Sequence, residues 1–165
     1  MECRVKNIPI YYEEFGEGRP VVQIHGYFCD HRMMTGCMES IFAKRSGYRR
    51  IYPDLPGMGK TPGADWVMSS DSMLEVVLEF IDQVIPGENF LLAGESYGGY
   101  LARGIIKRWP QRVDGLMLLC PCVVADRTKR DRPNHVVLKE DKELLAELDP
   151  KSAEEFGSIA VVQNE

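Results

Sequence analysis

The chain has 165 residues, of which 44% are hydrophobic and 27% charged, and its formal net charge at pH 7 is −5. This length and apolar content suffice for one core of domain size. The acidic balance argues against a nucleic-acid partner, because no sustained basic patch offsets phosphate charge. No apolar stretch approaches membrane-spanning length, and residues 1–10 lack a signal-peptide core. Five cysteines, an odd number, favour reduced thiols, so we expect a cytoplasmic protein that does not bind membranes.

The N-terminal part of the chain alternates short apolar runs with turns. We predict an edge strand over residues 10–15, followed by a glycine-rich turn. A β-branched strand over 20–24 leads directly into His-Gly-Tyr-Phe at 25–28. A helix is predicted over 37–44, ending at Ser46-Gly47. Strands and helices therefore alternate from the beginning of the sequence.

The middle of the chain continues this alternation. Residues 50–61, Arg-Ile-Tyr-Pro-Asp-Leu-Pro-Gly-Met-Gly-Lys-Thr, predict a strand followed by a loop. A long helix is then expected, beginning among the serines and the aspartate at 69–72 and ending before Pro86-Gly87. Within it, Ser72 and Glu75 have the spacing of a capping box.

The run at 89–99, Asn-Phe-Leu-Leu-Ala-Gly-Glu-Ser-Tyr-Gly-Gly, is the most informative stretch. It holds the pattern G-x-S-x-G with Ser96 at its centre, typical of a nucleophile elbow. A serine is a poor nucleophile unless it is exposed beside a base, and a strained strand-to-helix turn provides that exposure. Apolar residues at helical spacing over 101–109, stopped by Pro110, predict the required helix. We therefore prefer an elbow to a buried serine in a glycine-rich turn.

The last regular strand is expected over 113–119, mostly apolar, like a parallel strand that is buried on both faces. Together, the alternating strands and helices predict a doubly wound, mostly parallel sheet. Beyond this strand, residues 138–148 predict a charged helix with leucines on one side.

Three motifs in this order resemble the α/β-hydrolase family: the His-Gly loop at 25–28, the loop at 54–61 and the elbow at Ser96. The second matches the family pattern D-x-P-G-x-G-x-S/T. The resemblance covers residues 8–122 and is specific in combination. It implies an α/β-hydrolase core, with a mostly parallel sheet and flanking helices, in the style of small esterase-like members.

This resemblance implies a serine hydrolase that cleaves a small-molecule ester or related acyl bond through an acyl-enzyme. Ser96 is the expected nucleophile, and the backbone N–H groups of Tyr97 and Tyr27 are the expected oxyanion hole. The Phe28 N–H is the alternative second donor, and the side chains of Tyr27, Phe28 and Tyr97 would line an apolar acyl pocket. No metal or organic cofactor is implied. Serine at the elbow disfavours the carboxylate chemistry of epoxide hydrolases and dehalogenases.

The expected catalytic triad is incomplete. In this fold its members follow the order Ser, acid, His, and His135 is the one histidine after Ser96. A polar segment without a preceding strand surrounds His135, which makes it a poor candidate base. We expect residues 1–125 to be the N-terminal part of the core, incomplete at its C-terminal end, and residues 126–165 to begin a cap or lid. A missing C-terminal segment or a second chain would then supply the acid and histidine, leaving the isolated chain inactive; the alternative is a non-catalytic α/β-hydrolase-like binding module.

Other motifs favour structural roles. The run at 57–61 resembles the end of a P-loop, but the first glycine of that motif falls at Asp54. A metal site is disfavoured because the spacing of its four candidate ligands fits no zinc pattern: His25, Cys29, His31 and Cys37. We expect His25 to hold the oxyanion loop by hydrogen bonds. The cysteines of Cys-Pro-Cys at 120–122 lack the spacer of a redox pair and are expected to pack at a strand end.

Overall fold

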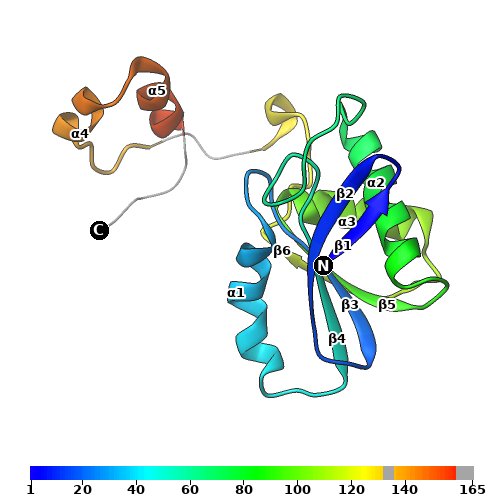
Figure 1. Ribbon diagram of the computed structural model, residues 1–165. Helices are drawn as coiled ribbons and strands as arrows, with labels where there is room; N and C mark the ends of the chain where they lie inside the picture. Colours follow the sequence, from blue (N-terminus) through cyan, green and yellow to red (C-terminus); the bar gives the residue numbers. More distant parts are fainter. Residues whose placement is uncertain (132–135, 159–165) are drawn as a thin grey trace. The chain divides into compact units, whose positions relative to one another are not determined.

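A six-stranded sheet with the order β1-β2-β4-β3-β5-β6 forms the centre of residues 1–125 (Figure 1). The computed structural model describes residues 1–131 and 136–158. β2 pairs antiparallel with β1 and with β4, and the remaining neighbours are parallel, which confirms the predicted mostly parallel sheet. The strands are β1 (Glu2–Val5), β2 (Ile8–Phe15), β3 (Arg19–Ile24), β4 (Tyr48–Pro53), β5 (Phe90–Glu95) and β6 (Val113–Leu119).

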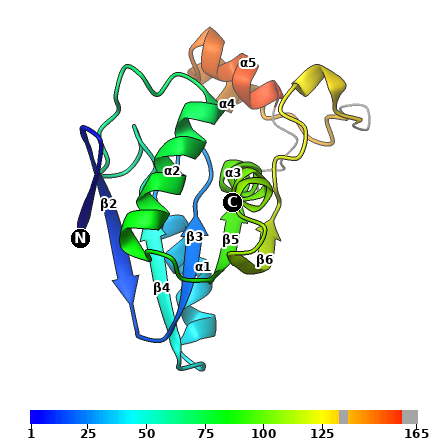
Figure 2. The same cartoon turned by 90° about the vertical axis from the view of Figure 1, so that its right-hand side faces the viewer.

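Helices cover both faces of this sheet. Figures 1 and 2 show α1 (His31–Phe42) on one face, and α2 (Ser70–Val84) and α3 (Tyr97–Arg108) on the other. The larger core includes fully buried Phe80 and Ile105 from α2 and α3, and the smaller core contains Met34 from α1. Each such side chain contributes roughly 1.5–3 kcal/mol by leaving water. Because β4, β3, β5 and β6 are parallel, their carboxyl ends lie together at one edge of the sheet, and the two cores pack against its two faces.

The two ends of the sheet differ from the sequence-based prediction. β2 is not the edge strand, because β1, which the sequence pattern did not predict, pairs along its outer side. β6 has the predicted bounds, but it is not buried on both faces: its central side chains are 37–39% exposed, namely Leu116, Met117 and Leu118. In the part of the chain that the structure describes, no strand pairs with the outer edge of β6. β6 carries one charged side chain, Asp114 near its start, and residues 115–119 are glycine and apolar residues, whereas β1 carries Glu2 and Arg4.

Two helices begin at other residues than predicted. α1 starts at His31 rather than at residue 37, because Asp30 caps it by accepting a hydrogen bond from the Arg32 N–H. α2 has its capping box at Ser69 and Ser72 rather than at Ser72 and Glu75. Several capping residues stand in a row there, and only the backbone geometry selects among them.

The second compact unit covers residues 126–165, and its described part is helical. It contains a short 3₁₀ turn, η1 (Arg127–Lys129), followed by α4 (Lys142–Glu147) and α5 (Pro150–Ser158). α4 is shorter than the helix predicted over 138–148, because Asp141 accepts hydrogen bonds from two N–H groups and caps it there.

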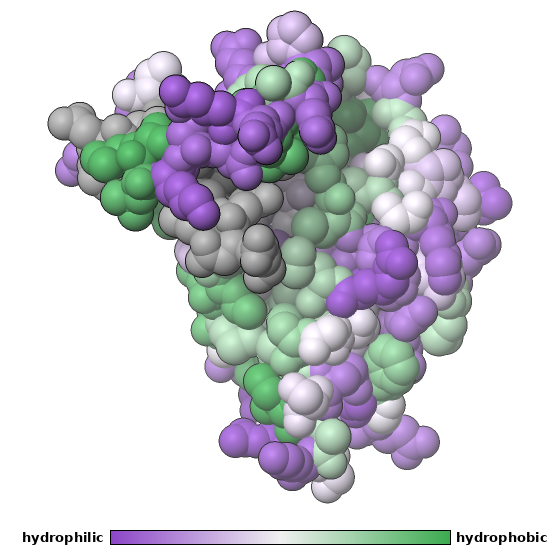
Figure 3. All heavy atoms as spheres, turned by 90° about the vertical axis from the view of Figure 1, so that its left-hand side faces the viewer, coloured by the Kyte–Doolittle hydropathy of each residue, from purple (hydrophilic) through white to green (hydrophobic). Residues whose placement is uncertain are grey.

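Apolar side chains also reach the surface. On the face shown in Figure 3 they lie among hydrophilic ones. In the second unit Leu138 and Leu144 are exposed. Among residues 1–131 and 136–158, no helix is both long and apolar enough to cross a membrane.

Candidate active site

Ser96 lies in the sharp turn between β5 and α3. Its backbone has φ +48° and ψ −107°, a region that is unfavourable for any residue with a side chain. Three hydrogen bonds hold it there: its N–H donates to the Leu119 carbonyl (3.0 Å), and its carbonyl accepts from Tyr100 (3.2 Å) and Cys122 (2.9 Å). The strained serine backbone that the elbow motif predicts is therefore present.

Two glycines make the turn possible. A Cβ at Gly98 would lie 2.2 Å from the carbonyl oxygen of Ile24, and a Cβ at Gly94 would lie 2.5 Å from that of Gly98. These contacts are with backbone atoms, which cannot move aside without separating α3 from β3 and β5. The elbow therefore needs glycine at both positions.

The loop that connects β3 with α1 lies against the elbow. A Cβ at Gly26 would lie 3.2 Å from the Cβ of Ser96, and the ring centroids of Tyr27 and Tyr97 are 5.5 Å apart. Among the hydrogen bonds of the described residues, none uses the backbone N–H of Tyr27 or Tyr97. The positive end of the α3 dipole also faces this turn. Free N–H groups beside this half-buried serine are suited to stabilising a developing oxyanion.

Aromatic side chains gather beside Ser96. The rings of Tyr27 and Phe28 have centroids 4.4 Å apart, and the Tyr97 hydroxyl donates a hydrogen bond to Ser70 at 3.1 Å. Phe28 itself has φ +61° and is 90% exposed. The structure thus places Tyr27 beside Tyr97, the residue after Ser96, and Phe28 beside Tyr27, but the described residues do not enclose the Phe28 ring in a pocket.

His25, which follows β3 and begins the loop that connects it with α1, is fully buried. Its Nδ1 lies 2.7 Å from the Gly26 carbonyl oxygen, and its Nε2 accepts a hydrogen bond from the Leu55 N–H at 3.0 Å. A neutral ring with its proton on Nδ1 satisfies both contacts. Burial lowers the pKa of His25 below the ordinary value of 6.5 and keeps the ring neutral. Both nitrogens are engaged, so His25 cannot take a proton from Ser96.

We expect the free energy of unfolding to fall as the pH is lowered from about 7.5 to about 5. Because the pKa of His25 is lower in the folded state than in the unfolded state, its contribution is fully present above pH 6.5 and is lost as the pH falls toward the folded value. Asp30 does not interfere, since its hydrogen bonds with Arg32 lower its pKa to about 2. Urea unfolding at several pH values measures the slope. If the free energy of unfolding of His25→Asn fell equally steeply with pH, His25 would not be the cause of the pH dependence.

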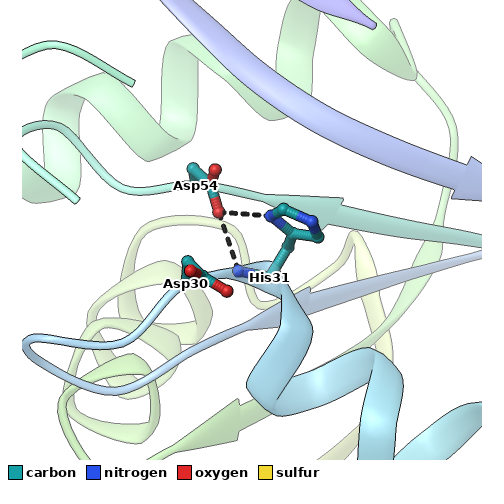
Figure 4. A group of neighbouring side chains, drawn as sticks. All are labelled: Asp30, His31 and Asp54. Atoms are coloured by element: carbon teal, nitrogen blue, oxygen red, sulfur yellow. Dashed lines mark hydrogen bonds and ion pairs between the residues drawn. The ribbon is translucent and has the colours of Figure 1, made fainter. Parts of the chain in front are cut away.

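Asp30, His31 and Asp54 form a group whose potential ligand atoms lie within 4.8 Å of one another (Figure 4). Their carboxylate oxygens already accept hydrogen bonds from protein groups: those of Asp30 from Arg32, and those of Asp54 from His31 and Lys60. Hydrogen bonds within the protein therefore account for the close approach of these three residues. Of the four residues considered and disfavoured as a metal site, His31 alone belongs to this group of described residues; His25, Cys29 and Cys37 lie outside it.

The remaining candidates are placed as follows. His135 lies outside the described residues, so its dismissal as the base stays a prediction. Cys120 and Cys122 directly follow β6 and form no disulfide in the described part of the chain; Cys120 is exposed rather than packed, and the Cys122 N–H donates to the Ser96 carbonyl. The sequence did not predict the contact between His31 and Asp54. Asp54 stands in the family loop pattern, but nothing local indicates that His31 is its partner.

Comparison with known proteins places this geometry in a family. The family model described as alpha/beta hydrolase fold matches residues 19–157. The AB hydrolase superfamily protein YisY of Bacillus subtilis (strain 168) is 30% identical over 148 residues, which are 87% of this chain and 52% of that protein. A pimeloyl-(acyl-carrier protein) methyl ester esterase of Legionella pneumophila (strain Corby) is 32% identical over 108 residues, 66% of this chain and 40% of that protein. The chain spans about half the length of these curated relatives.

Solved structures agree with the sequence relatives. The crystal structure of an alpha/beta superfamily hydrolase from Oenococcus oeni PSU-1 has a TM-score of 0.75 and 33% identity, covering 99% of this chain and 60% of that chain. A thermophilic esterase from Thermogutta terrifontis has a TM-score of 0.65 and 25% identity, covering 76% of this chain and 45% of that chain. With the family model matched over most of its length, the chain belongs to the α/β-hydrolase fold family.

Proposed function

We propose that this chain carries the nucleophile and oxyanion hole of a serine hydrolase that cleaves small-molecule esters or related acyl bonds. The observation that carries the proposal is the strained Ser96 beside two free backbone N–H groups, those of Tyr97 and Tyr27. The esterase names of several relatives support the same reaction class.

In the proposed reaction, the Ser96 Oγ attacks the carbonyl carbon while a base takes its proton. The carbonyl oxygen becomes an oxyanion, which accepts hydrogen bonds from the N–H groups of Tyr97 and Tyr27; the Phe28 N–H is the alternative second donor. Loss of one such donor costs roughly 3 kcal/mol of transition-state stabilisation. The leaving group departs with the proton, and water then hydrolyses the acyl-enzyme.

Neither histidine in the described part of the chain has a free ring nitrogen to act as the base of this reaction. Both ring nitrogens of His25 are engaged, and the ring nitrogens of His31 lie 2.8 Å from Asp54 and 3.2 Å from Glu13. We therefore place the catalytic acid and histidine on a further segment, either C-terminal to this chain or on a second chain. We also assign residues 126–165 to the start of a cap.

The edge of β6 supports this arrangement. Its apolar side chains are exposed and its outer side is unpaired among the described residues. A strand added there in parallel would bring its carboxyl end toward Leu119, whose carbonyl oxygen accepts the Ser96 N–H. Reactive groups in parallel sheets collect at this edge.

The decisive test is covalent labelling by a fluorophosphonate. In a polypeptide that joins this chain to the completing segment, we expect labelling at Ser96, read by mass spectrometry of the modified peptide. Ser96→Ala should remove the label, whereas Ser70→Ala, which changes a neighbouring serine hydroxyl, should keep it. A label that persists in Ser96→Ala would disprove the assignment.

The alternative function is a non-catalytic binding module with the same fold. The observation that favours it is that neither described histidine has a free ring nitrogen. The fluorophosphonate labelling experiment distinguishes the two functions. A binding module would bind an acyl compound beside Tyr27 and Tyr97, yet Ser96 would stay unlabelled even with the further segment present.

A further inference from the structure

The oxyanion loop at residues 26–30 begins and ends beside buried histidines that share one anchor. At its start, the His25 Nε2 accepts the Leu55 N–H at 3.0 Å. At its end, the backbone N–H and the Nδ1 of His31 lie 2.7 Å and 2.8 Å from the same oxygen of Asp54 (Figure 4). The consecutive residues Asp54 and Leu55, directly after β4, therefore hold both ends of the loop.

Asp54 is suited to be a rigid anchor. It is fully buried, and its second carboxylate oxygen accepts the Lys60 N–H at 2.8 Å. Its own N–H donates to the Tyr11 carbonyl at 2.8 Å, which fixes the residue to β2. Both carboxylate oxygens and the N–H are thus satisfied within the protein. In a buried network each such bond restricts its neighbours more strongly than it would in water.

His31 is fixed from its other side as well. Its side chain is 5% exposed, and its Nε2 lies 3.2 Å from the Glu13 carboxylate. Glu13 in turn accepts a hydrogen bond from the Tyr11 hydroxyl at 3.0 Å, and that hydroxyl accepts one from the Lys60 ammonium at 3.0 Å. Contacts at both ring nitrogens set the orientation of the imidazole. This network joins β2, the loop after β4 and the start of α1.

The loop between these anchors is strained. Phe28 holds φ +61° although it has a large side chain and is almost fully exposed. An exposed residue keeps such a backbone conformation only when the structure on either side of it imposes it. The backbone conformation of the loop, including the positive φ of Phe28, sets the direction in which the free N–H groups of Tyr27 and Phe28 point.

We propose that Asp54 and His31 are positioning residues that hold the oxyanion loop in the conformation that directs its N–H groups toward the Ser96 reaction centre. This inference rests on the proposed function for the role of the loop. Neither residue touches the substrate in this proposal. They act through the backbone of residues 26–30.

The test uses two variants and a matched control in the polypeptide that contains the completing segment. Asp54→Asn leaves one acceptor oxygen where Asp54 offers two, so either His31 or Lys60 faces a second donor. His31→Gln is the milder second variant, because one amide group can reach Asp54 or Glu13 but not both. Glu39→Gln is the control. Glu39 lies on α1, as His31 does, and accepts hydrogen bonds from Arg50 and Tyr52 of β4, the strand directly before Asp54.

Two readouts are needed. Hydrogen–deuterium exchange of the backbone N–H groups at positions 29 and 31, which donate to the Gly26 carbonyl and to Asp54, should be roughly tenfold faster or more in Asp54→Asn and His31→Gln, and unchanged in Glu39→Gln. For an aryl ester, kcat should fall by about 10- to 100-fold in the two variants with little change in KM, because the loop contacts the transition state rather than the ground state. Glu39→Gln should lower the unfolding midpoint and leave kcat within about twofold.

Unchanged exchange of the loop in both variants would overturn the proposal. Faster exchange with unchanged kcat would overturn it too, because the loop would then be held without consequence for the reaction. Failure of the proposed function is recognised separately, as absence of Ser96 labelling in the wild-type protein. If Asp54→Asn does not fold, His31→Gln decides the question.

Discussion

Ester hydrolysis by the 165-residue chain alone is expected to proceed at a rate close to background. Ser96 and both proposed oxyanion donors are in place, but the ring nitrogens of His25 and His31 are engaged with other groups. Absence of the base and acid costs on the order of 10⁴ to 10⁶ in rate, because the serine hydroxyl keeps its proton. Hydrolysis of a chromogenic aryl ester measures this, with Ser96→Ala as the baseline.

Supplying the further segment, covalently or as a second chain, should restore the rate by several powers of ten, about the factor that triad residues provide. The required control is His135→Ala in the isolated chain, since His135 is the one histidine after Ser96. If the isolated chain is fully active and His135→Ala abolishes turnover, then His135 is the base and no further segment is needed.

Gly98→Ala should lower the free energy of unfolding by about 3 kcal/mol or more, the upper range for overpacking a close contact. The added methyl group would lie 2.2 Å from the Ile24 carbonyl oxygen and 2.7 Å from that of His25. Both are backbone atoms of the segment that leads into the oxyanion loop. The substitution must therefore push α3 away from β3 and distort the elbow. Urea unfolding measures the loss, and labelling of Ser96 should disappear with it.

Gly36→Ala is the matched control for this substitution. Gly36 also lies within a helix, α1, but a Cβ there would meet no atom within 4 Å. Since alanine favours helix more than glycine does, this variant should be more stable by up to about 1 kcal/mol. Equal effects of the two substitutions would show that helix propensity, and not close packing at the elbow, governs Gly98.

The sequence by itself determined the elements whose signals are local. The elbow at Ser96 was predictable because its strand, glycines and helix are consecutive, and α3 and β6 were identified from apolar runs bounded by turns. The mostly parallel sheet followed from the alternation of strands and helices, and the two loops at 25–28 and 54–61 were identified by their resemblance to family motifs. The positions of the helix starts did not follow, because several capping residues stand in a row before α2, and because the cap at Asp30 was not identified from the sequence.

Only the tertiary structure decided which residues are partners and which surfaces are covered. Asp54 binds His31 across 23 residues and Leu55 binds His25 across 30, so no local pattern indicates that one anchor holds both ends of the oxyanion loop. The apolar pattern of β6 is the same for an inner strand as for an edge strand, and pairing alone distinguishes them. The physical reason is the same in both cases. Propensity and periodicity act over a few neighbouring residues, whereas burial and hydrogen-bond partners depend on segments that meet only in the fold.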